Sequence, residues 1–180
     1  MSIMQPPITP NEIAVIVGSN TEKVFTTMLG LDVQAGPVDP EATLTNEEGK
    51  VVCLVGFTGQ WSGSGSISCS ASLACAISGK LLMTEYESVN DEVLDAMGEM
   101  ANMIIGNFKD EAASVLGPLG LSTPTVIFGN NFQTRNWNGQ SWIAVPFSCE
   151  GECFEVKICL VPNPALAAQS AAKTPDLLAV

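Results

Sequence analysis

The sequence predicts an α/β fold of the α+β type, in which two long helices pack on a mostly antiparallel sheet of about six strands. Residues 11–29 and 89–116 carry apolar side chains at helical spacing. Shorter runs of β-branched and aromatic residues, bounded by glycine, proline and serine, indicate the strands. Hydrophobic residues make up 46% of the 180 residues and charged residues 14%, a composition typical of a packed globular domain.

The first long helix is expected to begin at the cap-like Asn11 and to stop at Gly30. A polar linker rich in glycine, proline and acidic residues follows over residues 35–49. The chain therefore passes from its first helix to its first strands through a segment without a regular pattern.

Residues 50–57 and 65–71 are strand-like and predict a hairpin that residues 58–64 close. The GSGS motif at 63–66 lies between these two runs. It lacks the strand-then-helix context of a dinucleotide-binding glycine loop, so we interpret it as a turn.

Two more helices are predicted after the hairpin. A short one is expected over residues 73–82, with its end at Gly79. The second long helix, residues 89–116, has the strongest helical pattern of the chain. Asp91 and Glu92 lie in its first turn, where negative charge interacts favourably with the helix dipole.

Three strand-like runs follow the second long helix, at residues 125–129, 141–148 and 153–161. A chain of 180 residues suits one domain with a substantial core, and we assign residues 1–161 to it. Residues 162–180 are rich in proline and alanine and are expected to form a tail or a loosely docked helix without a chemical role.

A weak internal repeat crosses the chain. Residues 29–31 read Leu-Gly-Leu, as do residues 119–121, and Val-Gly-Phe at 55–57 matches Val-Pro-Phe at 145–147. Both matches have the same offset of 90 positions. Because both halves also run from helix to strands, we predict a duplicated fold with a pseudo-two-fold axis.

The chain contains no histidine, and this absence excludes several chemistries. Ser-His-Asp and Cys-His nucleophile systems cannot form, nor can zinc sites built on imidazole. The six cysteines lack the paired short spacings of a four-cysteine zinc site, and no GxxxxGK[ST] phosphate loop is present. We therefore expect no metal ion or cofactor in this chain itself.

Nineteen acidic and seven basic residues give a formal net charge of −12. Nucleic acid and anionic membrane surfaces would repel such a protein, so neither is an expected partner. The acidity serves solubility or steers a partner with a basic rim, and composition leaves both open. The N-terminus has no signal-peptide pattern, and no apolar stretch approaches the roughly 20 residues that span a bilayer, so we expect a cytoplasmic protein.

Most of the six cysteines lie in apolar segments and are expected to be buried free thiols. A chain of this size does not need disulfides to hold its fold together. Cys149 and Cys153 flank a predicted tight turn, where a cross-strand disulfide is an alternative that the sequence leaves open.

The second long helix carries a polar stripe formed by Asp95, Glu99 and Asn102. At 3.6 residues per turn, these three positions fall within an arc of roughly 60°. The apolar positions lie on another side of the helix, so the stripe is expected to face solvent. They are Leu94, Met97, Ala101, Ile104, Ile105 and Phe108.

Gly98 and Gly106 flank this polar stripe. Each interior glycine costs a helix about 1 kcal/mol relative to alanine, so propensity does not explain them. Missing side chains at both positions would let another backbone or a partner surface approach Glu99 and Asn102. A solvated face with incidental glycines is the alternative, and spacing alone leaves both interpretations open.

The spacing Asp95-x3-Glu99-x2-Asn102-x21-Pro124 resembles the signature of the CheC/CheX/FliY family of chemotaxis phosphatases. EMANMIIGN at 99–107 resembles the active-site helix of that family. The segment VVCLVGFTGQWSGSGSISCS resembles its G-F-x-G loop between strands, and LSTPTVIFGNN resembles its strand after the helix. The similarity covers about residues 11–160. With one Glu-x-x-Asn helix, the chain is most like CheX, which has a single site.

The resemblance implies a CheC-like fold and hydrolysis of the aspartyl phosphate of a CheY-like receiver domain. By that similarity, Asn102 would orient the attacking water and Glu99 would pair with a lysine of the receiver. Asp95, like Gly98 and Gly106, would contact the partner, and Pro124 would shape the strand beside the helix. Mg²⁺ would belong to the receiver, and family relatives pair into homodimers through their sheets.

Two alternatives of other classes remain at this stage. One is a module of the same fold that binds a receiver or a flagellar-switch component without hydrolysing phosphate. The other is a dimerisation domain whose polar stripe has no role. The presence of both Glu99 and Asn102 favours the enzyme, because an adaptor has less need of the amide.

Overall fold

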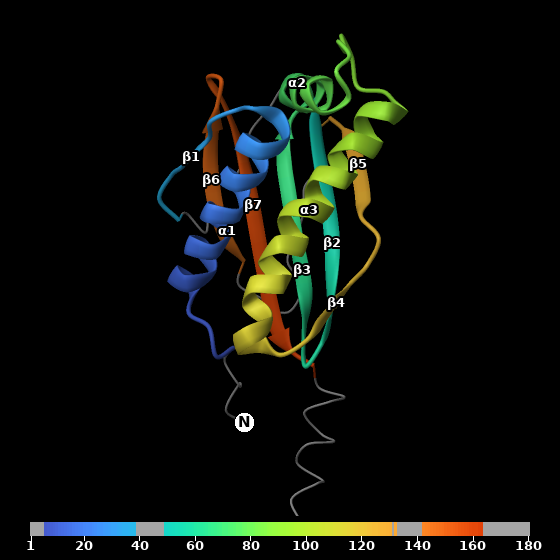
Figure 1. The fold of residues 1–180 in the computed structure, drawn as a ribbon. Helices are drawn as coiled ribbons and strands as arrows, with labels where there is room; N and C mark the ends of the chain where they lie inside the picture. The colour runs from blue at the N-terminus through green and yellow to red at the C-terminus, as the bar shows by residue number, and fades with distance from the viewer. Residues whose placement is uncertain (1–5, 39–48, 131, 133–141, 164–180) are drawn as a thin grey trace, which may run out of the picture.

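One antiparallel sheet with helices on one face forms the body of the protein (Figure 1). The computed structural model describes residues 6–38, 49–130, 132 and 142–163. Within them, seven strands form the order β1-β6-β7-β3-β2-β4, and β5 also pairs with β2. The elements are α1 (Pro10–Val24), the π-helical turn η1 (Phe25–Leu29), β1 (Gln34–Ala35), β2 (Lys50–Gly59), β3 (Trp61–Ser70), α2 (Ala71–Leu82), α3 (Asp91–Leu116), β4 (Leu119–Leu121), β5 (Thr125–Gly129), β6 (Ile143–Cys149) and β7 (Glu152–Pro162). The predicted fold class is confirmed.

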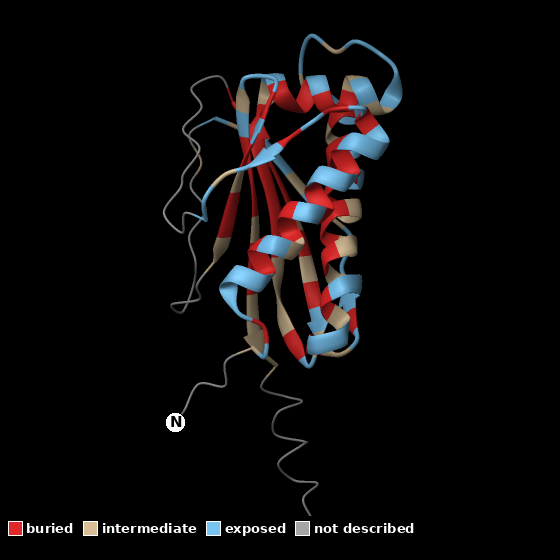
Figure 2. Cartoon of the chain, turned by 60° about the vertical axis from the view of Figure 1, so that its left-hand side comes forward, coloured by how far each residue is buried: buried red, intermediate tan, exposed pale blue. Residues whose placement is uncertain are grey.

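Helices α1 and α3 lie side by side across the sheet (Figure 1), and their inner sides are buried while their outer sides are exposed (Figure 2). Between helices and sheet, Phe154 stacks on Phe25 and on Phe147, with ring centroids 4.9 and 5.0 Å apart. Asn20 of α1 donates a hydrogen bond of 3.0 Å to Glu111 of α3. The core thus joins the two halves of the chain.

The first helix has its predicted end but a different start. Thr9, rather than Asn11, is its N-cap, and Pro10 takes the first helical position, which tolerates proline because no backbone donor is needed there. Thr9 and Glu12 form a capping box, typically worth about 1 kcal/mol. The chain then leaves η1 through Gly30 in the left-handed conformation, with φ of 65°.

The hairpin loop predicted at residues 58–64 is wrong. Strand β2 continues to Gly59 and β3 begins at Trp61, so the GSGS motif lies within a strand and is not a turn. Along β3, Gly63 and Gly65 lie on the helix side together with the core residues Trp61, Ile67 and Cys69, and serines alternate with them on the other side. A Cβ at Gly65 would lie 2.6 Å from the Cδ1 atom of Ile105, so glycine at this position lets α3 lie close to the sheet.

Helix α2 is longer than predicted. It begins at Ala71, after the N-cap Ser70, and continues through Gly79 to Leu82. Its end is Met83, a non-glycine residue in the left-handed conformation with φ of 53°. A Cβ at Gly79 would lie 2.8 Å from the carbonyl oxygen of Thr84, so this glycine makes room for the chain that folds back rather than ending the helix.

The later strands agree with the prediction apart from their bounds. Strand β5 matches its predicted range, β6 begins two residues later than expected, and β7 reaches Pro162. The sequence did not predict the two short strands β1 and β4. Most of the predicted linker (39–48) and all but the first two residues of the predicted tail (164–180) lie outside the described residues.

The sheet topology agrees with the predicted duplication. The hairpin β2–β3 and the hairpin β6–β7 pair with each other through β3 and β7, which run antiparallel. The long helix of each half lies over the hairpin of the other half, because α1 contacts β6 whereas α3 contacts β2 and β3 (Figure 1). Two copies of one unit related by a two-fold axis produce this arrangement.

All six cysteines are free, so Cys149 and Cys153 do not form a disulfide. Five of them are buried as predicted, whereas Cys153 is exposed. In the described ranges, no helix combines the length and the apolar character that crossing a bilayer requires.

Candidate functional site

Helix α3 places the predicted polar stripe on its outer side. Asp95 and Glu99 are exposed and Asn102 is half-buried, whereas the apolar positions predicted for the core are buried, apart from the half-buried Leu94. The expectation that the stripe faces solvent is therefore confirmed. Glu99 and Asn102, three residues apart, are neighbours on the helix surface, with roughly 5–6 Å between their Cβ atoms.

Two hydrogen bonds hold the first turn of α3, one to its N-cap residue and one from the preceding loop. Asn90 Oδ1 accepts a hydrogen bond of 3.0 Å from the backbone nitrogen of Val93. The Tyr86 hydroxyl donates a hydrogen bond of 2.7 Å to Glu92 Oε2. This bond raises the pKa of Tyr86, because the neutral phenol is the donor. The preceding loop is thereby attached to the helix face that carries the stripe.

Glu92 is a member of the stripe that the sequence analysis missed. It lies seven residues before Glu99, so the two differ by only roughly 20° around the helix. The i, i+7 spacing could have revealed this, but Glu92 had been interpreted only through the helix dipole. The stripe therefore extends from Glu92 to Asn102.

Gly98 is buried, and the surface that approaches it belongs to the chain itself. A Cβ at Gly98 would lie 3.3 Å from Val126 Cγ2 and 3.5 Å from Pro124 Cγ. Pro124 and Val126 come from the segment that leads into β5 and from β5 itself. Pro124 thus lies beside the helix as predicted, and the missing side chain of Gly98 makes room for it.

Gly106 has a more open environment. It is half-buried, and an added Cβ would have a single neighbour, Leu121 Cδ1 at the ordinary contact distance of 3.8 Å. Gly106 lies one turn beyond Asn102 on the same side of the helix. No side chain therefore projects from α3 at Gly106, and the surface beside Asn102 is open on the side toward the C-terminal end of the helix.

The G-F-x-G motif (56–59) forms the end of β2 and pairs with the short strand β4, at Phe57 with Leu121 and at Gly59 with Leu119. Ser122 then donates its backbone N–H to the Gly56 carbonyl at 3.0 Å, while its Oγ accepts from the Gly56 nitrogen at 2.8 Å. This pairing fixes the segment that carries Pro124 next to α3.

The stripe is free to interact with another molecule. Within the described ranges, no hydrogen bond or ion pair involves the side chains of Asp95, Glu99 or Asn102. An amide can donate and accept hydrogen bonds at once, and a carboxylate can accept from an ammonium group. Among the same residues, no three Asp, Glu or Cys side chains are grouped to hold a metal ion.

The described part of the first half has no equivalent of this site. The 90-residue offset places Thr9 and Glu12 at the positions of Glu99 and Asn102. Thr9 and Glu12 cap α1, and the hydrogen bonds from Thr9 lower the pKa of Glu12. With the offset of 90 residues, the first residue of α1, Pro10, corresponds to position 100 of α3. Helix α3 begins at Asp91, nine residues earlier, and Asp95 and Glu99 lie on these additional turns.

Comparison with protein families gives one match. The family model described as "Chemotaxis phosphatase CheX" matches residues 51–148, just over half of the chain. A comparison with curated protein sequences found no significant match.

Solved structures of similar fold include chemotaxis proteins. The chemotaxis protein CheX from Vibrio vulnificus is 28% identical, with a TM-score of 0.72 over 85% of this chain and 99% of that one. The CheX from Desulfovibrio desulfuricans is 27% identical, with a TM-score of 0.70 over 83% and 99%. The third, from Borrelia burgdorferi, is a CheX-CheY-BeF3-Mg²⁺ complex, 25% identical, with a TM-score of 0.72 over 86% and 99%.

Proposed function

This chain belongs to the CheX family of chemotaxis phosphatases, and we propose on that basis that it hydrolyses the aspartyl phosphate of a CheY-like receiver domain. The CheY-containing complex among the similar structures supports a receiver as the partner. Asn102 and Glu99 are the residues that we propose to act directly on that partner.

The observation that carries this proposal is an exposed carboxylate beside an amide on a helix face fixed by the fold. Within the described residues, neither the Glu99 nor the Asn102 side chain has a hydrogen-bond or ion-pair partner, so both are available to another molecule. The helix itself is held on its inner side by the core and on one flank by Pro124 and Val126. A reactive pair on a rigid element loses little freedom when a partner docks.

In the proposed mechanism, the amide of Asn102 enters the receiver's phosphorylation pocket and hydrogen-bonds a water molecule. Its oxygen accepts from that water and its nitrogen donates to a neighbouring oxygen, which aligns the water for in-line attack on phosphorus. The carboxylate of Glu99 pairs with a lysine of the receiver and fixes the approach. The P–O bond to the aspartate breaks, and the carboxylate and inorganic phosphate are released.

The receiver contributes the rest of the chemistry. We propose that Mg²⁺ is bound by the receiver, where it stabilises the charge of the transferred phosphoryl group. Asn102 is asked only to position one water, a contribution of a few kcal/mol to the barrier, or roughly a hundredfold in rate. This small requirement suits a chain without histidine.

The decisive experiment is a phosphate-release assay on a panel of phosphorylated receivers with Mg²⁺ present. The unaltered protein should accelerate phosphate loss from at least one receiver, and Asn102→Ala should reduce that acceleration roughly a hundredfold or more while binding remains. Asn107→Ala is the matched control, because Asn107 lies on the same helix but outside the stripe. If Asn102→Ala keeps full turnover, the water-positioning role is wrong. Binding without acceleration of any receiver would instead indicate a docking module.

The predicted pairing of two copies through their sheets stays a prediction. We propose a homodimer in solution, and sedimentation over a range of protein concentrations measures it directly. A monomer at every concentration would contradict this part of the proposal without affecting the phosphatase role.

A further inference from the structure

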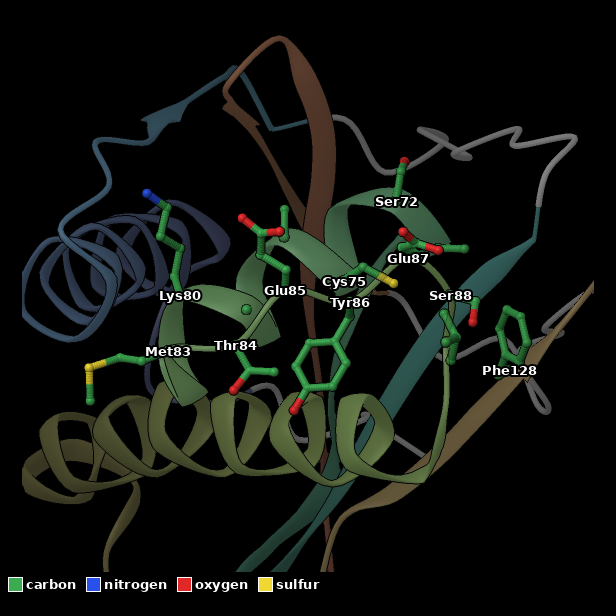
Figure 3. Close-up of a pocket in the computed structure, with 14 residues that line it drawn as sticks. Ser72, Cys75, Lys80, Met83, Thr84, Glu85, Tyr86, Glu87, Ser88 and Phe128 are labelled. Carbon is green, nitrogen blue, oxygen red and sulfur yellow. The ribbon is translucent and has the colours of Figure 1, made fainter.

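A groove of about 990 Å³ lies between the outer face of α2 and the loop of residues 83–89 (Figure 3). We call it the α2 groove. The loop leaves α2 at Met83 and passes alongside that helix before α3 begins. Phe128 of β5 stands at one end of the groove (Figure 3). The groove is lined by Tyr86, which hydrogen-bonds Glu92, but not by the stripe residues Glu92, Asp95, Glu99 and Asn102 themselves.

The α2 groove combines an apolar interior with an acidic rim. Cys75, Ala76 and Val89 line its walls, and burial raises the pKa of the Cys75 thiol, as an apolar environment does. Glu85 and Glu87 lie on its rim and are exposed. Together with the single cation Lys80, they leave the described lining with a net negative charge.

Two large apolar side chains beside the groove remain in contact with solvent. Met83 is 93% exposed and Phe128 is 45% exposed. Both line the groove. A groove with an exposed aromatic side chain and an apolar floor is typical of a surface that binds an apolar anchor of a partner.

The groove is continuous with the polar stripe on α3. Its loop is tied to the stripe by the hydrogen bond from Tyr86 to Glu92. Glu92 and Glu99 lie on the same side of α3 and are separated by roughly 10 Å along the helix axis, at 1.5 Å per residue. Because a typical partner covers about 800 Å², a molecule seated on Glu99 also reaches the groove.

Strand β5 makes the second connection between the groove and the site. Val126 packs against Gly98 one residue before Glu99. Phe128, two residues further along β5 and on the same side of the strand, lines the groove. One helix face and one strand therefore run from the proposed catalytic pair to the groove.

We propose that the α2 groove receives an apolar side chain, flanked by lysine or arginine, from the same receiver whose phosphate is hydrolysed at Asn102. This inference rests on the proposed function and adds the contact that selects among receivers. The basic flank follows from Glu85 and Glu87 on the rim and from Glu92 and Asp95 along the path to the site. A receiver lacking that flank would dock poorly even with an identical phosphorylation pocket.

Two pairs of variants test this proposal in the full chain. Phe128→Ser removes the aromatic side chain in the groove, and Ile127→Ser is its control, because Ile127 is the exposed neighbour on the opposite side of the same strand. Glu87→Lys reverses a rim charge, and Glu22→Lys, on the exposed surface of α1, is its control with the same change in net charge. Thermal unfolding of each variant confirms that it folds.

The readout is KM and kcat for a receiver that the unaltered protein dephosphorylates, phosphorylated with acetyl phosphate and Mg²⁺. Phe128→Ser should raise KM roughly tenfold and Glu87→Lys several-fold, with kcat within about twofold. Both controls should keep the KM of the unaltered protein. Equal effects of the two lysine variants would indicate long-range charge steering and overturn the proposal.

The outcomes separate this inference from the proposed function. If all four variants keep the original KM while Asn102→Ala abolishes turnover, the groove proposal fails and the phosphatase role stands. If no receiver is dephosphorylated, binding of a receiver loaded with beryllium fluoride and Mg²⁺ is measured instead. Binding that Phe128→Ser and Glu87→Lys weaken then supports the groove and rejects the phosphatase role. Absence of any binding rejects both.

Discussion

Replacing Gly106 by alanine should stabilise the fold and slow receiver dephosphorylation at the same time. Gly106 lies inside α3, where alanine is favoured over glycine by about 0.5–1 kcal/mol. The added methyl group would meet only Leu121 Cδ1, at 3.8 Å, so no crowding offsets this gain. For a chain of this size, such a gain raises Tm by roughly 1–4 °C.

The same methyl group would stand on the surface that the receiver is proposed to approach beside Asn102. If the receiver packs closely there, the extra volume costs about 1–3 kcal/mol of docking, as overpacking does. That range corresponds to a roughly 5- to 150-fold fall in kcat/KM. A gain in stability combined with a loss of activity is uncommon, and misfolding cannot produce it.

Two measurements on one preparation decide the matter. Urea unfolding with linear extrapolation gives the change in the free energy of unfolding, and phosphate release from a receiver gives kcat/KM. Lower stability would refute the open environment assigned to Gly106. Higher stability with unchanged kcat/KM would refute close approach of a partner at this position.

Three further outcomes follow from the packing and from the thiols. Gly65→Ala should destabilise the protein by about 1–3 kcal/mol in urea unfolding, because its methyl group would lie 2.6–2.9 Å from atoms of Ile105, and Ile105→Val in the same chain should recover part of the loss. Iodoacetamide should modify Cys153 rapidly in the folded protein and the five buried cysteines only after unfolding, so mass spectrometry that finds a second fast site would contradict the burial described. Burial raises the pKa of Cys53 to about 12, so between about pH 9 and 12 the unfolded chain binds fewer protons and the free energy of unfolding falls as pH rises. Cys53→Ala should flatten that decline, and an unchanged slope would contradict it.

The second long helix could be predicted from sequence because its signals are local. Its apolar positions keep one period over 26 residues, so the predicted range 89–116 differs from α3 by two residues at one end. The N-cap Asn90, which the prediction did not use, sets the start of the helix. The outward direction of Glu99 follows from the same period. The sequence alone could not predict that Pro124 and Val126 lie beside the helix at Gly98.

The errors concern features that depend on distant contacts. The GSGS segment has turn-like composition, yet it forms the centre of the sheet because β7 pairs with it and Gly65 lies beneath Ile105. The strands β1 and β4 have two and three residues and exist through pairing with β6 and β2. Gly98 likewise lies close to Pro124, which is 26 residues further along the chain, and no local sequence pattern predicts this contact.

The extra turns at the start of α3 also determine how many regulator molecules one chain can bind. A duplicated scaffold could in principle engage two regulators, yet Thr9 and Glu12 are committed to starting their own helix. Each polypeptide should therefore saturate with one equivalent of regulator, and two would be bridged only by a pair of polypeptides. The start of α1 is thereby released from contact with a regulator, while β2 and β3 of the same half still hold α3 in place.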